Sequence, residues 1–92
     1  MPRVEMTAHL YRFFPALKDR PLQVAGQSVA EVISSVEQLV PGFSDYLLDD
    51  QGALRRHVFV SVDDTVLVDR RHLSDVVGEN STVFIFQALT GG

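Results

Sequence analysis

Residues 28–40 form the longest segment of this sequence with a helical pattern of apolar residues. The residues expected on the apolar face of this helix are Val29, Val32, Ile33, Val36, Leu39 and Val40. Ser28 and Glu31 have the spacing of a capping box, in which the serine oxygen accepts from the Glu31 N–H and the Glu31 side chain reaches back to the Ser28 N–H. Pro41 and Gly42 end the helix. One amphipathic helix must bury its apolar face, so the rest of the chain must supply a partner layer.

Five further segments have the alternation or composition of strands. They are residues 4–13, 22–24, 56–62, 65–68 and 82–89. In the first of them, the residues expected on the buried face are Val4, Met6, Ala8 and Leu10. The first two strands would form a hairpin around residues 15–20, and Asp63 and Asp64 would turn the chain between the third and fourth strands. Residues 43–48 are predicted as a helical turn, and residues 69–81 as irregular.

The order strand, strand, helix, strand, strand, strand is typical of an α+β fold. In such a fold a mixed sheet carries one main helix across one face. The first and last strands are long enough to be central and to pair in parallel. This is the β-grasp arrangement, the architecture of ubiquitin. We expect one β-grasp domain over residues 1–90, followed by a flexible C-terminal diglycine tail at residues 91–92.

Composition excludes several kinds of function. The formal net charge of −4 argues against nucleic acid as a partner, because nucleic-acid binding needs a basic surface. The clusters at 55–57 and 70–72 are interpreted as solvated loops. No apolar run is long enough to cross a membrane and the start of the chain does not resemble a signal peptide, so we expect a cytoplasmic protein. The histidines are scattered, without the spacing of metal ligands, and no metal site is predicted.

The sequence ends in Thr90, Gly91 and Gly92, directly after an apolar strand. A C-terminal carboxylate is a poor electrophile and needs activation, usually as an acyl-adenylate, before a nucleophile can attack it. Two glycines have no Cβ and can enter a narrow channel in a partner's active site. The chain has no cysteine, so it has no thiolate nucleophile or persulfide of its own. We therefore expect Gly92 to carry the reactive carboxylate and Gly91 to give access to it.

Several segments together resemble the ThiS/MoaD family of ubiquitin-like sulfur-carrier proteins. They are the first alternating strand, the helix SVAEVISSVEQL, the strand and turn VFVSVDD, the segment VVGENSTVFIF and the terminal TGG. The resemblance implies that a MoeB/ThiF-type activating enzyme uses ATP to adenylate Gly92, which is then converted to a thiocarboxylate. A sulfur-accepting synthase would be the second partner. The chain would be a protein cosubstrate with no bound cofactor, or the non-catalytic small subunit of a synthase, and not an enzyme.

Within that family the chain is more similar to MoaD and CysO than to ThiS, because the stretch from Pro41 to Val62 is longer than a compact ThiS needs. Molybdopterin, cysteine and thiamin-thiazole synthesis are the pathways that this resemblance implies. Two other interpretations stay open. A ubiquitin-like modifier would be conjugated to lysines through the same Gly92, and a β-grasp interaction module would not use its terminal glycines at all.

The alternation of the last strand predicts an exposed apolar surface. If Val83 and Ile85 face the helix, then Phe84, Phe86 and Ala88 face away from it, and Phe59 does the same on the middle strand. An apolar patch of this kind usually marks a protein partner. We expect Phe59, Phe84, Phe86, Ala88 and Leu89 to bind the activating enzyme and the sulfur acceptor in turn. The alternatives are the opposite strand register, or a cover supplied by residues 70–80.

Overall fold

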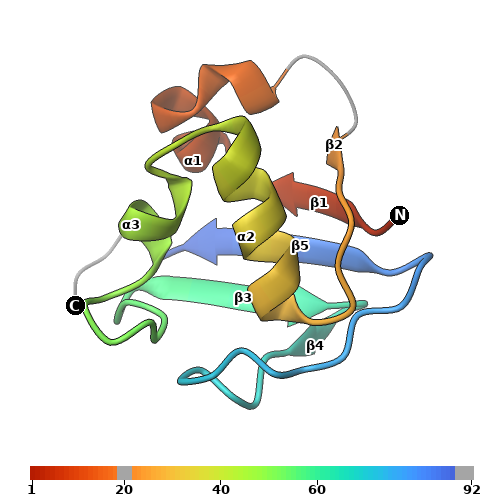
Figure 1. The fold of residues 1–92 in the computed structure, drawn as a ribbon. Coiled ribbons are helices and arrows are strands. Elements are labelled where there is room, and N and C mark those ends of the chain that lie inside the picture. The colour runs from red at the N-terminus through yellow and green to blue at the C-terminus, as the bar shows by residue number, and fades with distance from the viewer. Residues whose placement is uncertain (19–21, 89–92) are drawn as a thin grey trace.

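The computed structural model describes residues 1–18 and 22–88. Its strands form one mixed sheet in the order β2-β1-β5-β3-β4 (Figure 1). The strands are β1 (Arg3–Met6), β2 (Leu22–Gln23), β3 (Val58–Val62), β4 (Thr65–Val66) and β5 (Thr82–Gln87). The helices are α1 (Ala8–Phe13), the short 3-10 helix η1 (Pro15–Leu17), α2 (Val29–Leu39) and α3 (Phe43–Leu47).

The first and last strands lie side by side in the middle of this sheet. β1 pairs in parallel with β5, with Val4 opposite Val83 and Met6 opposite Ile85. β5 pairs on its other side with β3 in antiparallel register. The α+β, β-grasp architecture expected from the order of the segments is therefore confirmed, including the parallel pairing of the first and last strands.

α2 crosses one face of the sheet, and the side chains between the two layers form the core (Figure 1). The most deeply buried of them include Val4, Val29, Val32, Val36, Val60, Val83 and Ile85. α3 adds Phe43 and Leu47 to the same core, as predicted, and both are fully buried. The strand residues between the core positions point to the opposite face of the sheet, which α2 does not cover.

The prediction of one long first strand over residues 4–13 was wrong. The strand ends at Met6, Thr7 is the N-cap of α1, and Ala8 is exposed rather than buried. From Leu10 onward the buried residues are spaced by four and three, at Leu10, Phe14 and Leu17. That spacing is helical, so packing against the core follows the period of α1 and η1.

The pairing of β1 with β2 is antiparallel, as the predicted hairpin requires. However, the connection contains α1 and η1 rather than a simple loop. Residues 19–21 of this connection lie outside the described residues. The fourth and fifth strands are also shorter than predicted and end at Val66 and Gln87.

The start of α2 shows half of the predicted capping box. The Ser28 Oγ accepts a hydrogen bond from the Glu31 N–H at 3.2 Å. The Glu31 carboxylate accepts from the Gln27 N–H at 2.9 Å, one residue earlier than expected. At the other end of α2, Leu39 is 53% exposed and does not belong to the core, contrary to the prediction, while Val40 is partly buried.

Two matched truncations on α2 test this assignment of the core. Ile33→Ala should lower the free energy of unfolding by about 2–5 kcal/mol, because the side chain is buried between helix and sheet. Leu39→Ala should change it by less than about 0.5 kcal/mol, because its side chain already contacts solvent. Urea unfolding of both variants and the parent measures the difference. Equal losses would contradict the described packing of α2.

Candidate functional site

Three phenylalanines form a stacked strip on the sheet face opposite α2. Phe59 of β3 lies directly across from Phe86 of β5, with ring centroids 5.4 Å apart, and Phe84 lies 5.5 Å from Phe86 along the same strand. All three residues are half-buried, although none of the described helices covers them. Cross-strand aromatic pairs of this kind stabilise a sheet and at the same time leave a flat apolar surface in water. We call these three residues the Phe strip.

The register of β5 places the strip on this face. Val83 and Ile85 are fully buried against α2, so the residues between them must point the other way. Ala88 continues the alternation past the end of the strand, and its N–H donates to the His57 carbonyl at 2.9 Å. The expected site residues Leu89, Gly91 and Gly92 lie outside the described residues.

Arg70 packs against the end of the strip formed by Phe59. Its guanidinium carbon lies 5.1 Å from the centre of the Phe59 ring, a cation–π arrangement. The same guanidinium donates to the carbonyl oxygens of Arg55 and Val58, both at 2.8 Å. The side chain therefore satisfies one carbonyl before β3 and that of the first residue of β3, and it sets a positive charge beside the ring.

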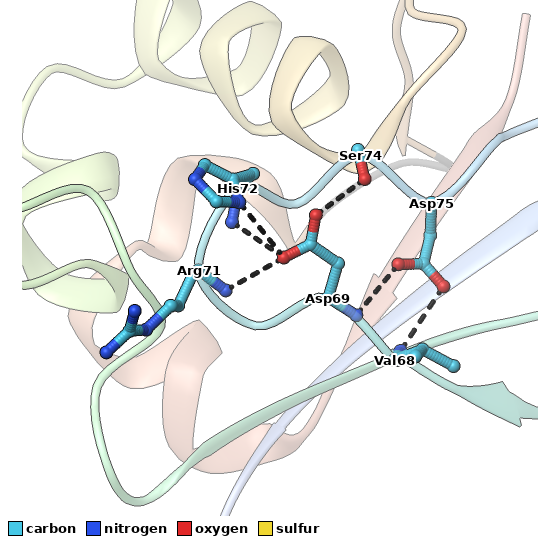
Figure 2. Close-up of polar contacts among 6 residues, drawn as sticks. All are labelled: Val68, Asp69, Arg71, His72, Ser74 and Asp75. Carbon is cyan, nitrogen blue, oxygen red and sulfur yellow. Dashed lines mark hydrogen bonds and ion pairs between the residues drawn. The ribbon is translucent and has the colours of Figure 1, made fainter.

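Asp69 and Asp75 organise the loop that contains Arg70, and Figure 2 shows the hydrogen bonds of these two aspartates. The Asp69 carboxylate accepts from the Ser74 hydroxyl at 2.6 Å and from the backbone N–H groups of His72 and Arg71. The hydrogen bond from the Ser74 hydroxyl, first, and that from the His72 N–H lower the Asp69 pKa to about 2. Asp75 closes the loop by accepting from the Val68 and Asp69 N–H groups.

The same loop runs beside the start of α2 and not across the Phe strip. The carbonyls of Asp75 and Leu73 accept from the N–H groups of Val29 and Ala30, the first two residues of the helix. Leu73 is buried. Residues 70–80 therefore do not form the cover that was considered as an alternative, and Arg70 reaches the strip as a side chain only.

The other end of the strip is acidic. A hollow of about 500 Å³ is lined by Glu5, Ser61, Asp63, Asp64, Thr82 and Phe84. Glu5 lies opposite Phe84 in the parallel β1–β5 register, and the two aspartates form the turn after β3. Arg3 lies 4.0 Å from Glu5, but both side chains are about half exposed, so the pair is weak.

The two aspartates of this turn differ in their role. The Asp63 carboxylate accepts from the Thr82 N–H at 2.9 Å, which fastens the turn to β5 and is the largest cause that lowers the Asp63 pKa. Both residues have positive φ angles, 49° for Asp63 and 72° for Asp64. A two-residue hairpin of this type favours glycine at its second position. Asp64 therefore occupies a position where glycine would suit the backbone better.

The strand that leads to the tail is anchored on the helix side as well. The Tyr46 hydroxyl of α3 bonds the Gln87 side-chain oxygen at 3.0 Å. α3 is in turn fixed by Glu37, whose carboxylate accepts from the Ser44 and Gly42 N–H groups. The bond from Ser44, first, and that from Gly42 lower the Glu37 pKa. The end of β5 is thus held between β3 and α3 up to the last described residue.

Within the part of the chain that the structure describes, no group of three or more histidine, cysteine, aspartate or glutamate side chains could hold a metal ion. No described helix has the length and apolar character that crossing a membrane requires. The candidate site is a surface, formed by the Phe strip and the charged groups at its two ends.

No known family pattern matches the sequence, and no curated protein sequence matches it. Solved structures do. The CysO structure from the Amycolatopsis orientalis BexX/CysO complex has a TM-score of 0.84 and 24% identity, with 100% of both chains covered. Mycobacterium tuberculosis CysO has a TM-score of 0.81 and 24% identity, covering 97% of this chain and 100% of its own. Small archaeal modifier protein SAMP1 from Haloferax volcanii has a TM-score of 0.75 and 16% identity, covering 99% of this chain and 98% of its own. The chain has the β-grasp fold of these proteins.

The sequence did not reveal the charged groups at the two ends of the strip. Arg70 belongs to a cluster interpreted as a solvated loop, and Asp63 and Asp64 were explained as turn residues. Glu5 lies between the predicted core residues Val4 and Met6, so the alternation places it on the face away from the core, but nothing in the sequence shows that it lies beside Phe84. The parallel pairing of the chain ends brings them together, and that register is visible only in the structure.

The low pKa of Asp69 gives a testable pH dependence. The folded-state pKa of about 2 lies below the ordinary value of an aspartate, so the stabilisation from this carboxylate is full above about pH 4 and is lost as the pH falls toward 2. Asp69→Asn should therefore have a smaller decrease in the free energy of unfolding between pH 4 and pH 2 than the parent protein. Urea titrations at several pH values measure this. The same slope in both proteins would show that the Asp69 hydrogen bonds are not formed in solution.

Proposed function

We propose that this protein is a sulfur carrier whose Gly92 carboxylate is adenylated, converted to a thiocarboxylate and used as a sulfur donor. The observation that carries the proposal is the Phe strip, an apolar surface that none of the described helices covers and that lies largely on β5, the strand that precedes residues 89–92 in the sequence. A carrier needs a surface that docks on an enzyme and sets the end of its chain in the active site. The shared fold with CysO supports the same function.

The reaction first activates the Gly92 carboxylate and then replaces one of its oxygens by sulfur. A Gly92 carboxylate oxygen attacks the α-phosphorus of ATP, and pyrophosphate leaves. A sulfur nucleophile from a donor, such as a persulfide, then attacks the acyl carbon and expels AMP. Reductive cleavage of the S–S bond by a thiol would leave the thiocarboxylate when the donor is a persulfide. The chain contains no cysteine, so this sulfur must come from a partner.

The proposal assigns two partners to the Phe strip. The first is an activating enzyme of the MoeB/ThiF type, which supplies the ATP-binding site. The second is a synthase that accepts sulfur for a molybdopterin-type or cysteine-type biosynthesis in the cytoplasm. The structure of CysO in complex with BexX supports docking of this kind, since a protein of the same fold is bound there by another protein. In both encounters the chain is a cosubstrate and its partner is the catalyst.

A second function is favoured by the likeness to SAMP1, which is described as a modifier protein. In that reaction a lysine amine, rather than sulfur, attacks the adenylated Gly92 and forms an isopeptide bond. The docking surface and the activation step are the same for both functions. The nucleophile of the second step distinguishes them.

The product of activation tests the proposal. Incubation with ATP, a sulfide source and the activating enzyme from the same cell should replace one oxygen of Gly92 by sulfur, seen in the intact mass and mapped by fragmentation. A variant without Gly91 and Gly92 should keep its mass. A parent protein that also keeps its mass, while a family carrier is converted by its own activating enzyme, would contradict the proposal. Conjugates to lysine in place of thiocarboxylate would favour the modifier.

The role of the Phe strip has its own test. Phe84→Arg should leave the fold intact, because the side chain lies on the open face, and should lower the rate of activation at least about tenfold by placing a charge in the apolar interface. Val76→Arg is the matched control, because Val76 is 80% exposed and lies outside the strip. Pyrophosphate release measures activation, and circular dichroism measures folding. Unfolding of Phe84→Arg would show that the ring belongs to the core, and normal activation would exclude the strip as the docking surface.

A further inference from the structure

The Phe strip has opposite charges at its two ends. Glu5, Asp63 and Asp64 surround the hollow beside Phe84, and Arg70 lies on Phe59 at the other end. The acidic end is next to the start of β5, and the basic end is near Ala88, where the chain leaves the sheet. The apolar strip alone does not define which way round a partner binds. The charges at its ends do.

We infer that the acidic hollow receives a lysine or arginine side chain of the activating enzyme, so that the enzyme docks in the one orientation that directs the tail to its active site. This inference rests on the function proposed above. In the reverse orientation the enzyme's cation would meet Arg70, and like charges brought together in a desolvated interface are costly. The charge distribution therefore selects the orientation, while the rings supply the contact area.

The contacts of the turn support a binding role for Asp64 in particular. Asp63 is explained by the fold, since its carboxylate and its backbone both bond Thr82. Asp64 is exposed, its φ of 72° is strained for a residue with a Cβ, and no hydrogen bond or ion pair of its side chain occurs among the described residues. The fold would be served better by glycine at this position. A carboxylate there contributes charge to the hollow instead.

Neighbouring charges do not cancel this acidic end. Arg3 lies 4.0 Å from the Glu5 carboxylate, at the limit of an ion pair, and both groups remain about half exposed. The Asp63 pKa is lowered, so that carboxylate is ionised at neutral pH. The hollow therefore keeps a net negative charge that a cationic side chain of the partner can neutralise.

Reversing the charge of Asp64 tests the inference. The same change at Asp50, in another turn, is the control. Asp64→Lys should lower kcat/KM for activation about tenfold at low ionic strength, through KM, and the loss should shrink in about 0.5 M salt. Asp50→Lys makes the same change in net charge at an exposed turn before β3, and its kcat/KM should equal that of the parent. Pyrophosphate release by the activating enzyme from the same cell is measured for all three proteins.

Asp64→Gly separates docking from folding. Because glycine relieves the positive φ, this variant should melt about 2–5 °C higher than the parent. Because it removes the carboxylate, its KM for activation should still rise several-fold. A loss of activation in a more stable protein cannot come from unfolding.

The outcomes distinguish the inference from the function on which it rests. No activation of the parent protein would contradict the proposed function, and the inference with it. Activation of the parent with equal KM values for Asp64→Lys, Asp64→Gly and Asp50→Lys would overturn the inference alone. A loss in Asp50→Lys as large as that in Asp64→Lys would also overturn it, because the effect would then come from net charge.

Discussion

The parallel pairing of β1 with β5 determines the rest of the molecule. It joins the first and last strands at the centre of the sheet, with β2 added beside β1 and β3 and β4 added beside β5. The pairing also fixes the register of β5, so that Val83 and Ile85 enter the core beneath α2. Because side chains alternate along a strand, the same register places Phe84 and Phe86 on the opposite face. A constraint that serves folding therefore also builds the candidate docking surface.

The positions of the six phenylalanines show that the sheet separates the buried core from the exposed candidate docking surface. Phe14 and Phe43 are buried on the side of the helices, and Phe13 of α1 contacts Tyr46 on that side. The three rings of the Phe strip lie on the other side, where water or a partner must cover them. Arg70 and the acidic hollow then give the exposed face a direction along β5. Two hydrogen bonds hold the end of this strand. The Ala88 N–H donates to the carbonyl of His57, just before β3, and the Tyr46 hydroxyl of α3 donates to the Gln87 side-chain oxygen.

The spacing of apolar residues predicted those helices and strands in which a single spacing continues along the whole element. The apolar spacing of α2 and the alternation of β3 and β5 were sufficient to predict the fold and the face of the Phe strip. The strand prediction was wrong after Met6, because a few alternating residues also fit a helix. The buried residues Leu10, Phe14 and Leu17 have helical spacing, which matches α1 and η1. The charged ends of the strip could not be predicted, because Glu5 meets Phe84 across the whole length of the chain. Such a contact depends on register, which a local pattern does not contain.

Fluorine NMR of the protein labelled with fluorophenylalanine tests whether partners bind the open face of the sheet. All six rings report at once, and single substitutions assign them. On addition of the activating enzyme and ATP, the account predicts that the resonances of Phe59, Phe84 and Phe86 shift or broaden, while those of Phe13, Phe14 and Phe43 keep their shifts. Changes confined to Phe13, Phe14 and Phe43 would place the partner on the helix side and contradict the account.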